Sequence, residues 1–504
     1  MPDSQTSLSQ DPVDTELIPV TTVSEVPADG CHNQDEQRAA AAAAGKQSTL
    51  DQYAKDYPQG PHDQPQSMCP AFGSLRVGLR MRRTATVLSG SACCVYGLTF
   101  TSHFYGAKRT VGYVPFDSET LVTGKLFEDI RDATHDLADP AQYDVIVVIN
   151  LCVPTASGVP LDLLPKSING VRVIGIDVPG FGVPTHAEAK DILAAAMLRY
   201  ARKEASEGPV ARPTGMAETK LPSVALLGEI FPVDAITIDS LLKPMGVCAG
   251  PVVPTREWRE LYAALDCDVV AALHPHYTAS QREFAQAGRP TLGSAPVGVE
   301  GTVAWLRGIG KALRLSEDSV NQHCESLRSQ IQEIIKANPI NARITLSGYE
   351  GSELLVARLL VECGADLRYV GTACPATAWS ADDRAWLENN GVEVRFRASL
   401  EQDVAAVDHY QPDLAIGTTP VVQHAKEQRI PGLYFTNLIS ARPLMGPAGA
   451  ASLAGIVTSA IGNRDRFETM EAFFGNTGRQ DRAGIWTPDT VNRTAFASTD
   501  KASC

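Results

Sequence analysis

Three cysteines lie at positions where thiolates could bind a metal group. Cys69 stands in the segment Met-Cys-Pro-Ala-Phe-Gly, ahead of the first apolar run. Cys94 follows the apolar run 84–88 through Ser-Gly-Ser-Ala-Cys-Cys, and Cys152 follows the run 143–149. Functional groups of open α/β sheets collect where strands end and loops lead into helices, so the three thiols can converge at one sheet edge. Thiolates are soft ligands suited to iron–sulfur clusters, and adjacent glycines let the backbone approach the sulfides.

Spacing alone leaves a second interpretation open. The cysteines are 25 and 58 residues apart and match no compact metal-binding motif, and a single cysteine is more often a small buried apolar side chain. The chain has 11 cysteines, an odd number with no Cys-x-x-Cys pair, which argues against a disulfide framework, a zinc ribbon and a thioredoxin-like site. Three protein ligands would leave a four-iron cluster one ligand short, which predicts a partner subunit or a non-protein ligand.

Composition excludes several other classes of protein. The 504 residues carry 44 Lys and Arg against 58 Asp and Glu, a net charge of −14. An acidic chain is a poor nucleic-acid binder, because such affinity comes from neutralising phosphates. The sequence contains no run of about 18 apolar residues, so we expect no membrane span. The polar, acidic N-terminus lacks a secretory pattern, so we expect a cytoplasmic protein.

From Met68 onward the pattern is strand, loop and helix, repeated. Short runs rich in Val and Ile are bounded by Gly or Pro, as in parallel strands buried on both faces. The length suits about three domains at ~150 residues each. We therefore predict an α/β protein of three Rossmann-like domains, each with a parallel sheet flanked by helices. The predicted strands are 84–88, 143–149, 171–176, 221–227, 268–273, 343–346, 367–370, 392–396 and 414–417, and the predicted helices are 235–243, 279–287, 303–313, 316–337 and 351–363.

The predicted domains are 67–220, which contains the three cysteines, 221–340 and 341–475. Residues 1–66 hold eleven acidic and three basic residues with an alanine run, which is typical of a mobile acidic extension. A loosely packed tail is expected over 476–504.

Several catalytic motifs are missing. The pairs Gly124-Lys125 and Gly310-Lys311 lack both the upstream glycine and the following Ser or Thr of a P-loop, so this chain should not itself hydrolyse ATP there. Gly180-Phe-Gly182 lacks the third glycine of a dinucleotide fingerprint, and no G-x-S-x-G elbow is found.

Two further clusters have a structural interpretation that we prefer. His274-Pro-His276 has no other ligand at metal-binding spacing, so we expect a strand-end structural role. The basic run of the first domain is expected to be a solvated or salt-bridged face, with docking of an acidic partner as the alternative; its members are Arg76, Arg80, Arg82 and Arg83.

The sequences around the three cysteines resemble those of the cluster ligands in the nitrogenase component 1 superfamily. The segments are Cys-Pro-Ala-Phe-Gly, Ser-Gly-Ser-Ala-Cys-Cys-Val-Tyr-Gly and the strand Asp-Val-Ile-Val-Val-Ile-Asn before Cys152. The likeness continues through Val-Pro-Gly-Phe-Gly (178–182), Leu-Pro-Ser-Val-Ala-Leu-Leu-Gly (221–228) and Gln-Pro-Asp-Leu-Ala-Ile-Gly (411–417). It covers roughly 67–475 and is strongest to the Y-subunit family of chlorophyllide a oxidoreductase (bacteriochlorophyllide reductase).

The resemblance implies that Cys69, Cys94 and Cys152 bind a [4Fe–4S] cluster shared with a paired Z subunit, which supplies the fourth ligand in a heterotetramer of two Y and two Z. Cys93 then replaces the glycine that precedes this ligand in the family. Nitrogenase holds its catalytic metal cofactor at positions that match Ala272 or Leu273 and Phe435 or Thr436. None of these is a ligand, which favours a tetrapyrrole reductase over a nitrogenase.

The implied activity is the reduction of a carbon–carbon double bond in bacteriochlorophyll biosynthesis. A separate ATP-hydrolysing iron–sulfur protein, the X subunit, would deliver electrons singly through the cluster to chlorophyllide a, and the C7=C8 bond of ring B would take up two protons. The catalytic proton donors stay unknown. His103, Tyr105, His274 and His276 are candidates by chemistry alone.

Three alternatives remain at this stage. The chain could be the N subunit of the light-independent protochlorophyllide reductase, which would share the three ligands. It could be a non-catalytic cofactor-assembly scaffold of the same fold. It could also be a glycosyltransferase of tandem Rossmann-like domains without iron.

Overall fold

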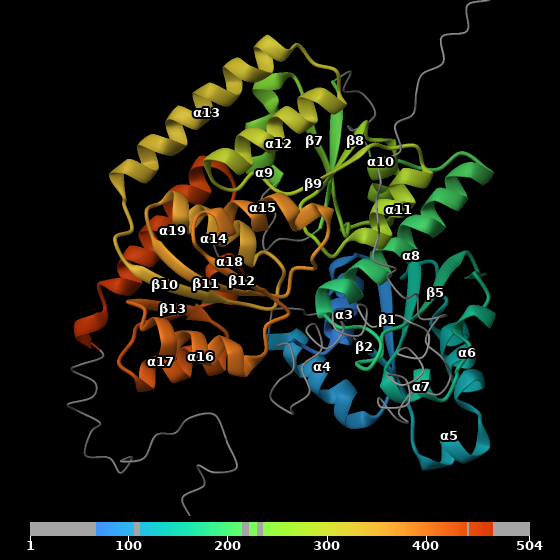
Figure 1. The fold of residues 1–504 in the computed structure, drawn as a ribbon. Helices are drawn as coiled ribbons and strands as arrows, with labels where there is room; N and C mark the ends of the chain where they lie inside the picture. The colour runs from blue at the N-terminus through green and yellow to red at the C-terminus, as the bar shows by residue number, and fades with distance from the viewer. Residues whose placement is uncertain (1–66, 105–110, 214–220, 229–234, 441–442, 467–504) are drawn as a thin grey trace, which may run out of the picture.

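The structure is a computed structural model and describes residues 67–104, 111–213, 221–228, 235–440 and 443–466, except for the side chains of 101–104 and 440. The described chain forms three β-sheets, each flanked by helices, as the sequence predicts (Figure 1). The acidic extension and the tail after 475 lie outside these residues.

The first sheet has the order β2-β1-β3-β5-β4. Its central strands β1 and β3 are buried along their whole length, which explains their unbroken apolar sequences. The strands are β1 (Thr84–Gly90), β2 (Val111–Pro115), β3 (Val145–Asn150), β4 (Ser167–Ile168) and β5 (Val171–Asp177). The helices are α3 (Pro70–Arg80), α4 (Ala92–Phe104), α5 (Ser118–Thr123), α6 (Leu126–Leu137), α7 (Cys152–Ala156), the short η2 (Leu161–Leu163) and α8 (His186–Glu207).

One edge of this sheet differs from the all-parallel prediction. Strand β4 pairs antiparallel with β5. The two strands are joined by Asn169 and Gly170, which both have positive φ angles of 51° and 83°. An Asn-Gly pair is the preferred connection of a two-residue hairpin, so the local turn adds this strand.

The second sheet, β7-β6-β8-β9, is fully parallel. Its strands are β6 (Ser223–Leu227), β7 (Cys248–Val253), β8 (Val269–Ala272) and β9 (Thr291–Gly293), and its helices are α9 (Ala235–Leu242), η3 (Lys243–Met245), α10 (Trp258–Asp266), α11 (Thr278–Gln286) and α12 (Gly298–Ala312). Helix α12 begins five residues before the predicted start at 303. Its first N–H groups donate to the Glu362 carboxylate of a distant helix, a cap that local sequence does not reveal.

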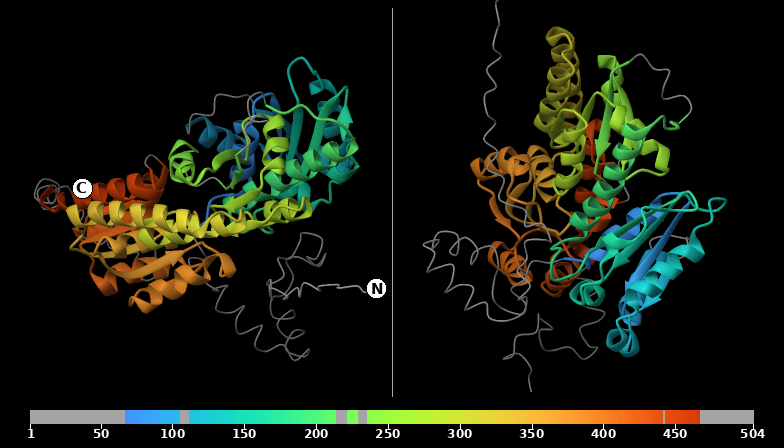
Figure 2. Two further views of the ribbon diagram at one scale, coloured as in Figure 1. Left: turned by 90° about the horizontal axis from the view of Figure 1, so that it is seen from above. Right: turned by 90° about the vertical axis from the view of Figure 1, so that its right-hand side faces the viewer.

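The third sheet, β12-β11-β10-β13-β14, is also parallel. Its strands are β10 (Arg343–Ser347), β11 (Asp366–Thr372), β12 (Glu393–Phe396), β13 (Leu414–Gly417) and β14 (Gly432–Tyr434). The helices are α14 (Glu353–Glu362), α15 (Ala378–Asn389), α16 (Leu400–Tyr410), α17 (Thr419–Glu427), α18 (Phe435–Ser440) and α19 (Gly446–Ile461). The long helix α13 (Glu317–Ala337) lies on the outside against α12 and α19 (Figure 2).

The hydrophobic cores join the sheets into one body. Alternate residues of β6 face two different cores: Val224 and Leu226 belong to a core shared with the third sheet, whereas Ala225 and Leu227 belong to a core shared with the first. The second sheet is therefore packed between the other two. This arrangement brings the carboxyl-end loops of three sheets toward a common junction.

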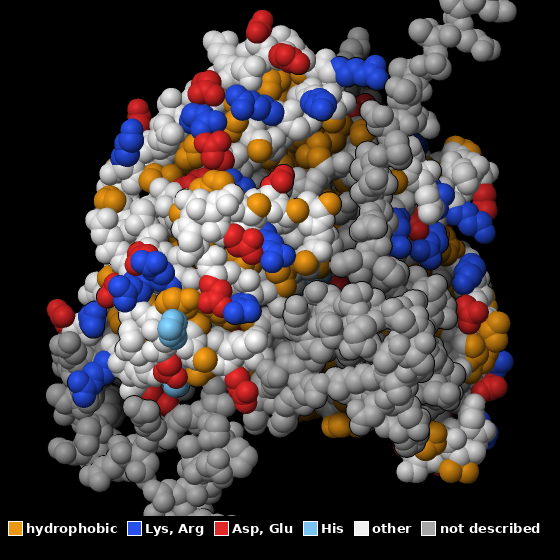
Figure 3. All heavy atoms as spheres, viewed as in Figure 1, with side chains coloured by type: hydrophobic (Ala, Val, Ile, Leu, Met, Phe, Trp, Pro, Cys, Tyr) orange, Lys and Arg blue, Asp and Glu red, His pale blue; other side chains and the backbone are white. Residues whose placement is uncertain are grey.

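On the face shown in Figure 3, the acidic and basic side chains of the described residues are interspersed. In the described ranges, no helix has both the length and the apolar character needed to cross a bilayer.

Candidate metal centre

The first sheet presents the three predicted cysteines at the starts of helices. Cys69 is the N-cap of α3, Cys94 lies in the first turn of α4, and Cys152 is the first residue of α7. In α3, Pro70 occupies the first turn, where its missing N–H costs nothing. The N-terminal end of a helix carries positive partial charge, which favours thiolate over thiol.

The three thiols interact with one another. Burial raises the pKa of Cys69, and the neighbouring Cys152 and Cys94 thiols raise it further, because adjacent thiolates repel. The backbone N–H groups of Ala71 and Phe72 act in the opposite direction by hydrogen bonding to the sulfur. The thiols of Cys94 and Cys152 therefore lie close enough to Cys69 to affect its charge, although the three residues are far apart in sequence.

A hydrogen-bond network orients the Cys152 turn. The backbone N–H of Gly180 donates to Cys152 Sγ at 3.1 Å. The carboxylate of Asp177, at the end of β5, accepts hydrogen bonds from Asn150 Nδ2 and Thr155 Oγ1, each at 3.0 Å. Asn150 precedes the cysteine and Thr155 follows it, so Asp177 clamps both sides of the turn.

Cys93 has a different environment. Like Cys69 and Cys94 it is exposed, but its Sγ lies 3.3 Å from the Ser91 hydroxyl. Hydrogen bonding from Ser91, and then from Cys94, lowers the pKa of Cys93. Cys69 interacts with the thiol of Cys94 and that of Cys152, which favours Cys94 as the member of the set.

The donor set suits a multi-iron cluster better than a single ion. In the described part of the chain, no three His, Cys, Asp or Glu side chains converge as the ligands of one metal ion would. The ligands of a cluster each bind a different iron and need not meet at one point. Thiol chemistry, helix N-termini and N–H groups directed at sulfur all fit such a group.

The other described cysteines lie elsewhere in the fold. Cys267, Cys324, Cys363 and Cys374 are buried, and Cys248 is half-buried in β7. Burial is the main reason that the pKa of Cys267 is raised to about 11 and that of Cys363 to about 12. These side chains behave as core residues, as predicted for most of the cysteines.

Among the described residues, several large apolar side chains around the thiols are exposed to solvent. Tyr96 is 73% exposed and Phe100 is 61% exposed, and their rings stack with centroids 6.2 Å apart on α4. Val153 beside Cys152 is 40% exposed, and Phe181 is 66% exposed. We call Tyr96, Phe100, Val153 and Phe181 the apolar rim. Large exposed apolar groups that gather in one area are typical of protein–protein contact.

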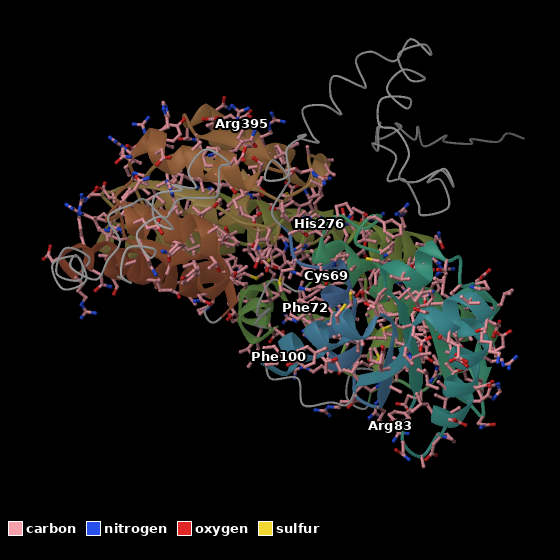
Figure 4. The ribbon with its side chains drawn as sticks, turned by 90° about the horizontal axis from the view of Figure 1, so that it is seen from below. Cys69, Phe72, Arg83, Phe100, His276 and Arg395 are labelled. Carbon is pink, nitrogen blue, oxygen red and sulfur yellow. The ribbon has the colours of Figure 1, made fainter. Side chains whose placement is uncertain are left out.

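The sequence-predicted pair His274 and His276 lies in the loop after β8, where the three sheets meet; Figure 4 shows His276 near the boundary of the first sheet. His274 is buried, its Nε2–H donates to the Glu350 carbonyl at 2.7 Å, and its Nδ1 accepts from the His276 N–H at 3.4 Å. Both ring nitrogens of His274 are thus used by the backbone. This geometry agrees with the expected strand-end structural role.

Two residues at this junction escaped the sequence analysis. His186 opens α8, and its Nε2 lies 3.0 Å from the carboxylate of Glu350, which follows β10. The available signal for Glu350 was a charged residue in the short loop between a buried strand, which ends at Ser347, and a helix that begins at Glu353. Of the other proton-donor candidates, the His103 side chain and Tyr105 lie outside the described residues.

Three of the four positions that match the nitrogenase cofactor ligands are apolar and buried, and the fourth, Thr436, is half-buried. Ala272 ends β8 and Leu273 follows it, and both are fully buried. Phe435 opens α18 and is 2% exposed. The basic run of the first domain is salt-bridged where its partners are defined: Arg82 pairs with Glu257 and Arg83 with Asp144.

Comparison with known proteins places the chain in a family. The family model described as nitrogenase component 1 type oxidoreductase matches residues 69–461. The chlorophyllide reductase 52.5 kDa chain of Cereibacter sphaeroides is 64% identical over 91% of this chain and 91% of its own length. The protein of the same name from Rhodobacter capsulatus is 64% identical over 91% and 92%, respectively.

More distant relatives agree with the fold. Subunit N of the light-independent protochlorophyllide reductase from Heliobacterium modesticaldum is 21% identical over 69% of this chain and 83% of its own. The solved structure "Nitrogenase Cp1 at pH 6.5" superposes with a TM-score of 0.62 at 17% identity, covering 87% of this chain and all of that one. The chain therefore belongs to the nitrogenase component 1 type oxidoreductases and, within them, to the family of the chlorophyllide reductase 52.5 kDa chain.

Proposed function

We propose that this chain is the Y subunit of chlorophyllide a oxidoreductase and that Cys69, Cys94 and Cys152 bind its [4Fe–4S] cluster. At 64% identity over 91% of its length, the chain is a chlorophyllide reductase subunit, a nitrogenase-like oxidoreductase. The observation that supports the cluster proposal is that all three cysteines lie at helix starts of the first domain and that the thiols of Cys94 and Cys152 act on that of Cys69.

The bound cluster would supply one-electron transfer. The chain's own residues would set the conditions for it. Gly180 N–H on one sulfur, and the N–H groups of Ala71 and Phe72 on another, stabilise negative charge on the ligands. Asp177 would keep the Cys152 turn in place through Asn150 and Thr155.

A partner subunit is needed to complete this site. Three thiols leave a four-iron cluster one ligand short, and the apolar rim beside them is exposed in the part of the chain that the structure describes. We infer that the Z subunit covers this rim and supplies the fourth ligand, in a heterotetramer of two Y and two Z. Because the sequence has no P-loop, ATP hydrolysis is assigned to a transient X subunit.

The substrate that we infer is chlorophyllide a, reduced at the C7=C8 bond of ring B with two electrons and two protons in the cytoplasm. His274 is a poor proton donor, because both of its ring nitrogens are held by backbone groups. His276 keeps two ring nitrogens without hydrogen-bond partners, with Nδ1 at 3.6 Å from the Glu188 carboxylate. The alternative assignment as subunit N is weaker, because that relative is only 21% identical.

The test is an anaerobic co-purification with the Z subunit, followed by an assay with the X subunit, ATP, dithionite and chlorophyllide a. The wild type should bind iron and produce a red-shifted bacteriochlorin absorption band. Cys69→Ala should lose most of the bound iron and all of the red shift, because it removes one of the three proposed ligands. The fold should be kept, because this thiol is exposed at the N-cap of α3.

The matched control is Cys248→Ala, a half-buried cysteine of β7 in the second sheet, which should keep both iron and activity. Bound iron without a red shift would contradict the assigned reaction but would agree with the proposed cluster. Wild-type protein without iron would contradict the cluster itself.

A further inference from the structure

A group of buried titratable side chains lies at the junction of the three sheets. It draws on α8, the loop after β8 and the loop between β10 and α14. All of its members are at most 5% exposed, and we call them the junction cluster; they are His186, Lys190, His274, His276, Glu350 and Glu353. Charged groups are rarely buried unless they are paired, so each needs a physical account.

Two members of the cluster are held in place by hydrogen bonds. The Glu353 carboxylate accepts the backbone N–H groups of Glu350 and Gly351 and the hydroxyl of Thr372. His274 donates from Nε2 to a carbonyl and accepts at Nδ1 from a backbone N–H. These contacts hold the loops together, and both ring nitrogens of His274 are already used by the backbone.

His186 is different. It is 1% exposed, and its Nε2 lies 3.0 Å from the Glu350 carboxylate. Its Nδ1 is buried and has no hydrogen-bond partner. A neutral ring that donates from Nε2 leaves a lone pair on Nδ1, so this atom can accept a proton.

The surroundings of His186 act on its proton site in opposite directions, and burial has the largest effect. Burial lowers the pKa of His186, Glu350 raises it, and Lys190 of α8 and Arg76 of α3 lower it. Burial by itself would raise the pKa of Glu350, but His186 and Lys190 outweigh burial and lower it to about 2. Glu350 therefore remains charged and can stabilise a His186 cation. Tyr349 packs edge-on against the same ring.

His186 lies close to the cysteine site, separated from Cys69 by about one turn of α3. The His186 ring packs against Phe72, with centroids 6.5 Å apart, and Phe72 is three residues after Cys69 in α3. At Gly73, a Cβ atom would lie only 1.8 Å from the His186 carbonyl oxygen, so the two backbones touch. Figure 4 shows Cys69 and Phe72 along this boundary. Negative charge added at the cysteines would thus be felt at His186 across dry protein.

We propose that His186 is a charge-compensating residue, which binds a proton at Nδ1 when an electron reaches the cysteine site and releases it when the electron leaves. The electron comes from the external one-electron donor and the proton from water, so the net charge of the region stays constant. Only the Nδ1–H bond forms or breaks. The inference rests on the proposed function, because it requires a redox group held by the three cysteines.

The test is an anaerobic redox titration of the Y–Z complex with dithionite, followed by electron paramagnetic resonance at several pH values from about 5.5 to about 8.5, the range in which histidine titrates. The wild-type midpoint potential should fall as pH rises, because reduction takes up a proton. His186→Gln keeps an amide donor for Glu350 but has no proton-accepting nitrogen, so its potential should lose this pH dependence while iron content stays unchanged.

The matched control is His424→Gln in α17 of the third sheet. His424 forms a similar pair with Asp408 at 2.8 Å, away from the cysteines, and this variant should keep the wild-type pH dependence. Glu350→Gln provides a second readout: without its charge, the His186 cation is less stable, and the pH-dependent range should move to lower pH.

A wild-type potential independent of pH, or a His186→Gln variant that keeps the wild-type slope with iron bound, would overturn the inference and leave the proposed function intact. Wild-type complex without iron would instead defeat the proposed function. If His186→Gln does not fold, an unshifted pH range in Glu350→Gln overturns the inference.

Discussion

Two adjacent thiols show how much one residue step matters. Successive residues of a helix point about 100° apart, so Cys93 and Cys94 cannot serve the same site equally. Cys93 lies on the exposed face of α4 with Tyr96 and Phe100, and its sulfur contacts Ser91. Cys94 interacts with Cys69 instead. Sequence resemblance already favoured Cys94, and the helix geometry supplies a physical reason.

We predict that Cys94→Ala loses most of the iron that the anaerobically purified Y–Z complex binds, whereas Cys93→Ala retains it. The reason is that, of these two neighbours, the Cys94 thiol is the one that affects the pKa of Cys69. Iron content and visible absorption measure the difference. Equal loss in both variants, or greater loss in Cys93→Ala, would contradict the assignment.

Among the elements, the packing of α3 on α8 is the contact that supports the cysteine site. Helix α3 begins at Cys69, and α8 begins at His186 after a Thr185 cap that accepts the Glu188 N–H. The helices approach so closely at Gly73 that only a residue without a Cβ fits. Glycine is chosen here for close approach rather than for an unusual backbone angle.

Gly73→Ala should therefore lower the free energy of unfolding by about 1–3 kcal/mol or more, the usual cost of overpacking, because both clashing atoms are backbone. Urea denaturation of the isolated chain measures it. Gly455→Ala in α19 is the control: a Cβ there meets nothing within 4 Å, so this change should stabilise by about 0.5–1 kcal/mol. An unchanged free energy of unfolding in Gly73→Ala would contradict this prediction, because it would mean that α3 and α8 can move apart without loss of stability.

In the whole molecule, the junction cluster makes the stability of three sheets depend on pH. Burial is the main cause that lowers the pKa of His274 well below its usual value, and the neighbouring His276 lowers it further. An unfolded histidine titrates near pH ~6.5. Above that pH His274 is neutral in both the folded and the unfolded chain, so its contribution to the free energy of unfolding is fully present. As pH falls below it, the unfolded chain binds the proton first and stability is lost.

His274→Gln should remove this loss while keeping an N–H donor for the Glu350 carbonyl. Between about pH 6.5 and about pH 5, wild-type stability should fall more steeply than that of the variant, by up to about 1.4 kcal/mol per pH unit. Denaturant titrations at each pH measure the slopes. Parallel curves for the two proteins would mean that His274 binds a proton in the folded state.

Local patterns in the sequence determined the class of fold and the central strands of the sheets, but not β2, β4, β7, β9 and β14. The Val- and Ile-rich runs predicted β1, β3, β5, β8, β10 and β13 to within two residues at most ends, because buried parallel strands need continuous apolar sequence. The family resemblance named the three cysteines, and thiols at strand ends explained why they could meet. Domain boundaries and ligand roles remain predictions.

Tertiary structure alone decided what lies across the junction. His186 and Glu350 are 164 residues apart, and each taken singly looks like an ordinary polar residue beside a helix or strand. Glu362 likewise extends α12 at its start from 63 residues away in sequence. Such pairs depend on how three sheets pack, and no local periodicity encodes that packing. Burial then gives these few contacts their strength, because a charge removed from water must find its partner inside the protein.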